Sequence, residues 1–182
     1  MDQSTKDIFE VLSWVAAVLA GIVAAGIAIY QMVLNRRQRS EELRWQQANA
    51  AKDLLNTIFN DPYFRNAMIM LDWSGRPFET KPGKWEQIKI SDVLSALRTR
   101  QLSFEDKEVF IRDCFDHVFD AFERLEHFIR INVVHFSDVE FEFGYYAKKL
   151  SEQREVFNNF LSQYGYKLAL MFLSRFEEWS WA

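Results

Sequence analysis

The chain has 182 residues, of which 49 per cent are hydrophobic, and its formal net charge is −4. This length allows one soluble domain of ordinary size beside a membrane span. Beyond residue 39 the chain holds 18 basic and 23 acidic residues, and this acidic balance argues against nucleic-acid binding, which needs a basic patch. The single cysteine, Cys114, excludes a disulfide framework.

The first element is an apolar helix at residues 11–34, where Gln31 is the only strongly polar side chain. A helix rises ~1.5 Å per residue and needs roughly 20 residues to cross the hydrocarbon of a bilayer. The segment is too long for the apolar core of a cleavable signal peptide, and residues 1–10 carry more acidic than basic charge. It is therefore predicted to span a membrane.

Basic residues set the expected orientation of this span. Arg36, Arg37 and Arg39 follow it directly, whereas Lys6 is the only basic residue before it. Lys and Arg next to a span are retained on the cytoplasmic side. We expect residues 1–10 outside a bacterial inner membrane and residues 35–182 in the cytoplasm.

Small side chains form two adjacent rows along the span, each with a spacing of four residues. In lipid there is little hydrophobic drive between helices, so close backbone approach over small residues promotes association. The rows predict a homo-oligomer in contact with membrane lipid, although Ala and Gly are also common in spans that do not associate. The residues are Ala16, Ala17, Ala20, Gly21, Ala24, Ala25 and Ala28.

The helical pattern continues over residues 35–60. An apolar stripe of Leu43, Gln47, Ala50, Leu54 and Ile58 has spacings of three and four residues, and neither Gly nor Pro interrupts the chain between Gly26 and Pro62. The span is therefore expected to extend as one helix to about Asn60. The stripe faces either the core of the following domain or a neighbouring copy.

Asp61 and Pro62 form a helix start, with Asp as the N-cap and Pro at the first helical position. We expect a helix over residues 62–73. Residues 78–84 are interpreted as a surface loop, because Pro82 and Gly83 break regular structure and the spacing of a phosphate-binding loop is absent. Residues 85–90 are either a short extended piece or the lead-in to a helix.

Ser91, Ser103 and Ser137 are the expected caps of later helices, the last two within capping-box patterns. No regular series of strands is visible. Residues 61–182 are therefore predicted to form an all-α cytoplasmic bundle of five or six helices. Beyond residue 90 these helices cover about residues 92–99, 104–134, 137–150 and 156–181.

Polar side chains share one face of the helix predicted at residues 104–134. Carboxylate and imidazole groups at this spacing are ligand types for a divalent metal. The simpler interpretation pairs them at i, i+4 on a solvated or interface face, each pair contributing ~0.2 to 0.5 kcal/mol. We predict no metal and no cofactor. The face holds Asp113, Asp116, His117, Asp120, Arg124 and His127, with Glu123 as the expected partner of His127.

Arg130 and His135 are separated by four residues and fit the R-x4-H pattern of HEPN domains, which are all-helical. The resemblance implies RNA cleavage at a dimer interface, in which His135 transfers a proton and Arg130 stabilises the phosphate charge. Other catalytic templates, including nucleotide-binding loops and HExxH, are absent from the sequence. The chain as a whole does not argue for an enzyme.

Two wider resemblances cover more of the chain. The span, the segment RRQR, the Asp61-Pro62 helix and the stretches GYYAKKL and FLSQYGYKLALMFLSRF resemble an uncharacterised family of bacterial single-pass membrane proteins with a helical cytoplasmic domain. A span joined to a helical domain with Arg130 and His135 is also similar, in architecture, to the membrane accessory protein of type VI-B CRISPR systems. This second resemblance implies a ring-like pore in antiviral defence, together with a protein partner of that defence system.

Three functions follow as hypotheses. The leading one is a self-associating inner-membrane protein that forms a pore or perturbs the membrane during phage defence. The second is a membrane-tethered HEPN-like ribonuclease that uses Arg130 and His135. The third is an anchored adaptor without catalytic activity, whose aromatic C-terminus either docks a partner or closes the core. The aromatic residues are Phe172, Phe176, Trp179 and Trp181.

Overall fold

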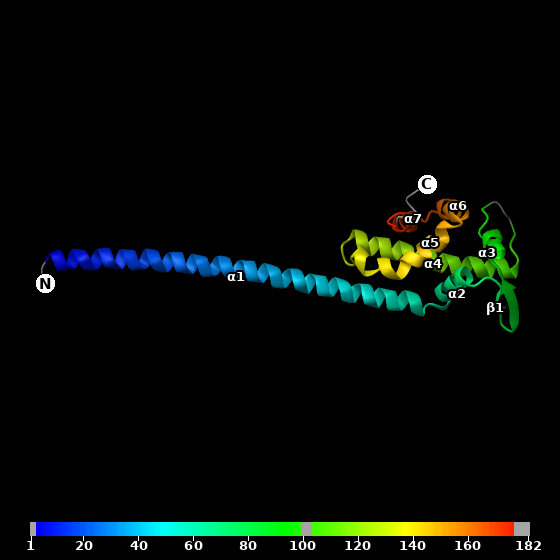
Figure 1. The fold of residues 1–182 in the computed structure, drawn as a ribbon, viewed down its shortest axis with the longest axis horizontal. Helices are drawn as coiled ribbons and strands as arrows, with labels where there is room; N and C mark the ends of the chain where they lie inside the picture. The colour runs from blue at the N-terminus through cyan, green and yellow to red at the C-terminus, as the bar shows by residue number, and fades with distance from the viewer. Residues whose placement is uncertain (1–2, 100–102, 177–182) are drawn as a thin grey trace. The chain divides into compact units, whose positions relative to one another are not determined.

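The structure is a computed structural model that describes residues 3–99 and 103–176, with side chains described at Trp14 and from Leu19 onward. The chain divides into two compact units, Met1–Gln46 and Gln47–Ala182 (Figure 1). We call them unit 1 and unit 2. Trp179 and Trp181, which the C-terminal docking hypothesis invokes, lie outside the described residues.

Helix α1 (Gln3–Asn60) supplies all of unit 1 that is described and the first segment of unit 2. The helix is unbroken to Asn60, as predicted from the absence of Gly and Pro after Gly26. Its described part contains one stretch that is long and apolar enough to cross a membrane, judged by length and composition alone. The most apolar 18-residue window of this stretch is not buried within the structure.

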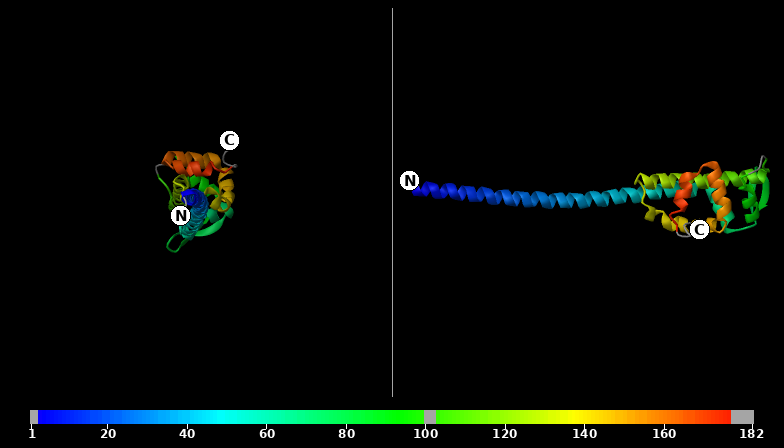
Figure 2. Two further views of the ribbon diagram at one scale, coloured as in Figure 1. Left: turned by 90° about the vertical axis from the view of Figure 1, so that its left-hand side faces the viewer. Right: turned by 90° about the horizontal axis from the view of Figure 1, so that it is seen from above.

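Unit 2 is mostly helical, and α4 contacts α2, α3, β1 and α7. Helices α6 and α7, orange to red in Figure 2, lie across one side of this unit. After α1, the described elements are α2 (Pro62–Asp72), β1 (Arg76–Lys81), β2 (Lys84–Ile88), α3 (Ile90–Ala96), α4 (Asp106–Arg130), the 3-10 helix η1 (Phe136–Asp138), α5 (Glu140–Ser151), α6 (Arg154–Tyr164) and α7 (Lys167–Leu173).

Phenylalanine rings fill the core of unit 2. Phe122 of α4 lies 5.7 Å from Phe143 of α5 and 5.1 Å from Phe172 of α7, measured between ring centroids. Cys114 and Leu125 of α4 are also fully buried. The α1 stripe contributes as well, since Ile58 is buried and its neighbours pack against the core, whereas Leu43 in unit 1 is exposed.

The loop predicted at residues 78–84 is wrong, and the mostly helical fold includes a β-hairpin. Strands β1 and β2 pair antiparallel, with Phe78 opposite Glu86. Gly83 adopts a φ of +78° in the turn, which glycine tolerates without steric cost. Phe78 and Ile88 are buried, whereas most of the charged side chains on the two strands are exposed.

Two helix ends differ from the prediction because of left-handed turns. Asn132, at φ +60°, ends α4 at Arg130, and the N–H of Val133 donates to the carbonyl of Phe128. Gly165, at φ +82°, divides the predicted last helix into α6 and α7, and the Tyr166 N–H donates to the Leu161 carbonyl. Both patterns are Schellman-type endings, which satisfy the last helical carbonyl groups.

The start of α2 is confirmed, whereas the serine caps are not. The Asp61 side chain accepts hydrogen bonds from the N–H groups of Tyr63 and Phe64, at 2.8 and 3.3 Å. Helix α4 begins at Asp106 with Glu105 as its N-cap, in place of Ser103. Likewise Lys89 precedes α3 and Val139 precedes α5, in place of Ser91 and Ser137.

Candidate functional site

The described apolar side chains of unit 1 are exposed. Between residues 19 and 34 the large ones range from 43 per cent exposed at Leu34 to 68 per cent at Tyr30. Ala20, Gly21, Ala24, Ala25 and Ala28 are exposed too, while the side chains of Ala16 and Ala17 lie outside those described. Arg36, Arg37 and Arg39 are exposed at the end of this segment.

Glycines on α1 leave room for larger side chains. A Cβ atom added at Gly21 or at Gly26 would meet no atom within 4 Å. The two positions are five residues apart, so on a helix they point about 140° away from each other. Only Gly21 belongs to the rows of small residues, and the two glycines therefore form a matched pair for testing that surface.

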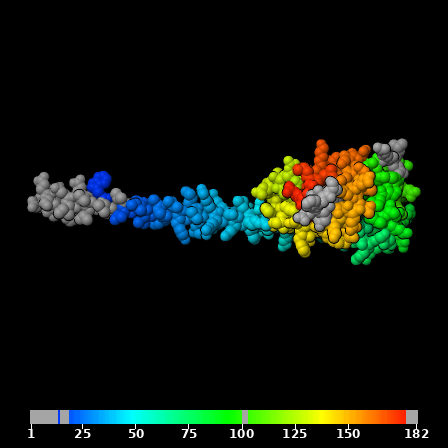
Figure 3. All heavy atoms as spheres, turned by 45° about the horizontal axis from the view of Figure 1, so that its top comes forward, coloured from blue at the N-terminus to red at the C-terminus, as the bar shows by residue number. Residues whose placement is uncertain are grey.

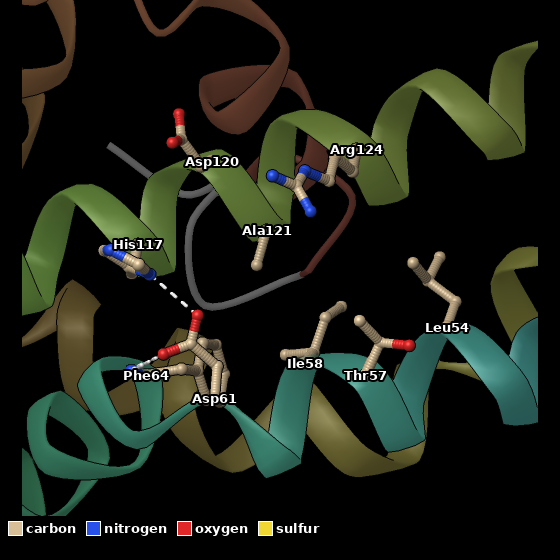
Figure 4. A pocket seen from close by; sticks show the side chains of 9 residues that line it. All are labelled: Leu54, Thr57, Ile58, Asp61, Phe64, His117, Asp120, Ala121 and Arg124. Carbon is tan, nitrogen blue, oxygen red and sulfur yellow. Dashed lines mark hydrogen bonds and ion pairs between the residues drawn. The ribbon is translucent and has the colours of Figure 1, made fainter.

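Unit 2 contains a polar cavity of about 120 Å³ between α4 and the end of α1 (Figure 4). Arg124 reaches from α4 toward the α1 segment, whereas Asp120 points away from it. The cavity brings together three members of the predicted polar face with a residue that spacing did not assign to it. The lining residues are Leu54, Thr57, Ile58, Asp61, Phe64, His117, Asp120, Ala121 and Arg124.

His117 and Asp61 form the best-defined polar contact of this cavity. His117 Nδ1 lies 2.7 Å from Asp61 Oδ2, and the imidazole stacks on Tyr63 at 4.6 Å between centroids. Partial burial raises the pKa of the Asp61 carboxyl, but hydrogen bonds from His117 and from the Phe64 and Tyr63 N–H groups outweigh it, so the pKa lies below its ordinary value.

This pairing fixes the tautomer of neutral His117. An ionised carboxylate only accepts hydrogen bonds, so Nδ1 carries the proton and Nε2 is left as an acceptor. His117 is 44 per cent exposed, which keeps Nε2 available to a proton donor. The arrangement orients an imidazole with a carboxylate, as acid–base sites do, although it equally ties the N-cap of α2 to α4.

The other residues of the predicted polar face do not share one site, and their contacts are separate. Asp116 is half-buried and accepts a hydrogen bond from the Tyr166 hydroxyl at 3.1 Å; burial raises its carboxyl pKa, and this hydrogen bond partly offsets the increase. Glu123, the expected partner of His127, instead accepts the N–H groups of Leu168 and Ala169 at the start of α7. Asp113 and His127 are exposed on the same helix.

Metal ligation is not indicated by the geometry of residues 3–99 and 103–176. Within these ranges no group of three or more His, Cys, Asp or Glu side chains is arranged to hold an ion. Cys114 is fully buried, and its burial raises the pKa of the thiol well above the ordinary value. A buried thiol of this kind is a weak nucleophile.

Arg130 and His135 lie on either side of the turn that ends α4. Both are exposed, and His135 Nδ1 lies 2.9 Å from Ser137 Oγ. The carbonyl of Asn132, at the centre of the turn, accepts a hydrogen bond from Gln47 Nε2 at 2.9 Å. The structure therefore anchors the turn to α1 and leaves both side chains accessible to a ligand.

Sequence reasoning missed a buried ion pair between α4 and the segment after α7. Glu126 is fully buried, and its two carboxylate oxygens accept hydrogen bonds from Arg175 Nε and Nη2 at 2.7 and 2.8 Å. Hydrogen bonding to Glu126 raises the pKa of the Arg175 guanidinium. Because the partners are 49 residues apart, helical spacing gives no signal for this pair.

Comparisons with known proteins found no match for the chain. No family model matches it, and neither a curated protein nor a solved structure is similar to it at a significant level.

Proposed function

We propose that the chain is a single-pass membrane protein, in which α1 anchors unit 2 to the cytoplasmic face and copies self-associate in the bilayer. The observation that carries the proposal is the exposed apolar surface of α1 between Leu19 and Leu34. A contiguous apolar surface of this length would promote aggregation in water. A bilayer whose hydrocarbon is about 30 Å thick covers it.

Orientation is tested by labelling cysteines on the two sides of the proposed span. In intact spheroplasts, a membrane-impermeant maleimide is expected to label the variant Ser4→Cys and to leave Ser40→Cys unlabelled until the membrane is permeabilised. Cys114 is fully buried and gives little background. Labelling of Ser40→Cys in intact spheroplasts would reverse the proposed orientation.

Self-association is supported by a polar side chain beside the small residues. Gln31 follows Ala24 by seven residues, so it points within about 20° of that small residue on a helix. A side-chain amide in hydrocarbon gains stability by hydrogen bonding to a neighbouring helix. The small residues bring two backbones close enough for such a bond.

The matched glycines test this association. Gly21→Leu is expected to weaken the assembly about tenfold or more, because the leucine side chain would keep the rows of small residues on two helices apart. Gly26→Leu is expected to leave the assembly unchanged. Sedimentation equilibrium in density-matched detergent, over a range of protein concentrations, measures both. Wild-type protein that stays monomeric throughout, or equal effects of the two variants, would contradict the proposal.

We further propose that the assembled protein perturbs the membrane, with phage defence as its setting. This step is supported by the architectural resemblance to the type VI-B accessory protein. Liposomes loaded with a fluorescent dye should leak when wild-type protein is reconstituted, and leak less with Gly21→Leu. If leakage is absent while the assembly forms, an anchored adaptor is the better description.

A membrane-tethered ribonuclease is the second candidate, because Arg130 and His135 are both exposed on one turn. His135→Ala is expected to abolish degradation of single-stranded RNA by the purified protein, and His127→Ala serves as the matched control because His127 is also an exposed histidine of unit 2. Equal RNA degradation by wild type and His135→Ala would refute this role.

A further inference from the structure

The side chain of Phe141 is 91 per cent exposed, more than any other large hydrophobic side chain described. It lies in the first turn of α5, whose inner face carries the buried Phe143 and Leu150. Residues 141 and 143 point about 200° apart on a helix, so Phe141 projects away from the core of its own unit. Packing within one copy therefore does not account for an aromatic residue at this position.

A cavity of about 430 Å³ is lined by Asp138 of η1 and by Glu142, the residue that follows Phe141 in α5. The yellow segment in Figure 3, which holds η1 and the start of α5, lies on the surface of unit 2. Its apolar part is formed by α1 and includes Phe59, whose ring stacks on Phe143 at 5.6 Å. Cavities near 150 Å³ already accommodate a benzene ring, so this one has room for a phenyl group. The lining residues are Ala48, Ala51, Lys52, Leu55, Asn56, Phe59, Asp138 and Glu142.

Charges of opposite sign stand on opposite sides of this cavity. Lys52 lies on the α1 side, whereas Asp138 and Glu142 lie on the side of η1 and α5. Lys52 and Glu142 are both exposed, and neither has an ion-pair or hydrogen-bond partner among the described residues. The rim therefore presents a cation and an anion beside one apolar hollow.

We propose that this face of unit 2 binds the same face of a second copy, with each Phe141 inserted into the other copy's cavity. The inference rests on the proposed self-association and specifies its cytoplasmic contact. A two-fold arrangement places a given surface patch against itself, so residue i meets residue j and residue j meets residue i. Phe141 then fills the partner's cavity, and Lys52 meets Glu142 of the partner subunit twice.

The positions of the aromatic residue and the cavity select a dimer contact. Phe141 lies between Asp138 and Glu142 in sequence, and both of these residues line the cavity. A head-to-tail ring needs the projecting residue and its cavity on different faces of the molecule. Here both belong to one patch, so the contact closes after two copies, and any larger assembly is built from such dimers.

Substitution of the aromatic residue is the first test. In full-length protein in detergent, Phe141→Ala is expected to weaken dimerisation about tenfold or more, as for a buried aromatic anchor of an interface. Trp85→Ala is the matched control, because Trp85 is an exposed aromatic residue on β2. Both side chains are exposed, so neither variant disturbs folding.

Charge reversal tests the pairing itself. Lys52→Glu alone and Glu142→Lys alone should each weaken association, and the double variant should restore it, since the reversed charges again meet across the two-fold axis. Glu155→Lys, an exposed residue on α6, controls for the change in net charge. A double variant that associates no better than the single ones would overturn the arrangement.

Cross-linking between two differently tagged copies locates the contact. A copy with Lys52→Cys and a copy with Glu142→Cys should form a disulfide between chains, whereas Lys52→Cys with Glu155→Cys should not. If wild type is monomeric, self-association itself fails. If wild type associates and responds to Gly21→Leu but not to Phe141→Ala, only the cytoplasmic contact proposed here is overturned.

Discussion

The two units differ in where their apolar side chains lie. Unit 2 buries eight phenylalanine rings almost completely, whereas the large apolar side chains described in unit 1 are all exposed. Burial of apolar surface stabilises a fold by about 25 cal/mol per Å², so unit 2 carries its own source of stability. The described apolar side chains of unit 1 lack such burial, and in the proposed membrane protein lipid or another helix would cover them.

This contrast predicts which property each substitution changes. Truncation of a core side chain in unit 2 should lower the free energy of unfolding and leave membrane association intact. Truncation of an apolar side chain in unit 1 should do the reverse. The following substitutions test that division, beginning with the largest expected effect.

Phe122→Ala removes a ring that packs on Phe143 and Phe172 in the centre of unit 2. We expect the free energy of unfolding to fall by about 3 to 5 kcal/mol, because the transfer term and the cavity term add. Ile27→Ala, at an exposed position of α1, should change it by less than about 0.5 kcal/mol. Urea titration in mild detergent, followed by near-ultraviolet circular dichroism, measures both. Equal losses in the free energy of unfolding would contradict the proposed difference between the units.

Arg175→Ala leaves the fully buried Glu126 carboxylate without its bidentate partner. Removing one member of a buried pair costs about 3 to 5 kcal/mol, and the partial exposure of Arg175 places the expected loss near 3. The double variant Glu126→Met with Arg175→Met should recover most of it, because no buried charge remains. Arg130→Ala, at an exposed arginine, is the control and should be nearly neutral in the same titration.

Local signals predicted the parts of the fold that depend on neighbouring residues. Asp61 caps α2 as expected, because an N-cap satisfies N–H groups two and three residues away. The long α1 follows from the helical periodicity of residues 35–60 and from the absence of Gly and Pro there. The hairpin was missed because its strands are short and highly charged, although Pro82-Gly83 between them is a turn signal.

The candidate site was predicted only in part, because its partners come from distant segments. Spacing on α4 placed His117 and Arg124 on one face, and both line the cavity. It assigned His117 to a partner four residues away, while the structure gives it Asp61, which is 56 residues away. Such pairs depend on how α2 packs on α4, and a single sequence does not contain that information.

Asp61 has two roles, as the N-cap of α2 and as the partner of His117, and two substitutions distinguish them. Asp61→Ala should lower the free energy of unfolding by about 1 to 2 kcal/mol, since the α2 cap and the contact with His117 are both lost. Asp61→Asn should cost less, because Asn is as good an N-cap as Asp and only the charge facing His117 disappears. The same urea titration distinguishes them. Equal losses would mean that the pairing with His117, and not the cap, accounts for the effect.

The smallest expected effect is a pH dependence confined to unit 2. A hydrogen bond from Arg98 lowers the pKa of Glu108 to about 2 from an ordinary value of 4.5; partial burial opposes this shift, and the Glu105 N–H reinforces it. Because the folded-state pKa is depressed, this stabilisation is complete above pH 4.5 and is lost as the pH falls toward 2.

Glu108→Gln should therefore lower stability by about 0.5 kcal/mol at pH 7, as expected for an ion pair at a partly exposed position, and by progressively less as the pH falls. Glu155→Gln, at an exposed site on α6, provides the baseline. Urea midpoints at pH 7, 4.5 and 3 measure the difference. A gap between wild type and Glu108→Gln that stays constant from pH 7 to pH 3 would show that the lost contribution is packing of the side chain, because only an ionic contribution disappears when the carboxyl group is protonated.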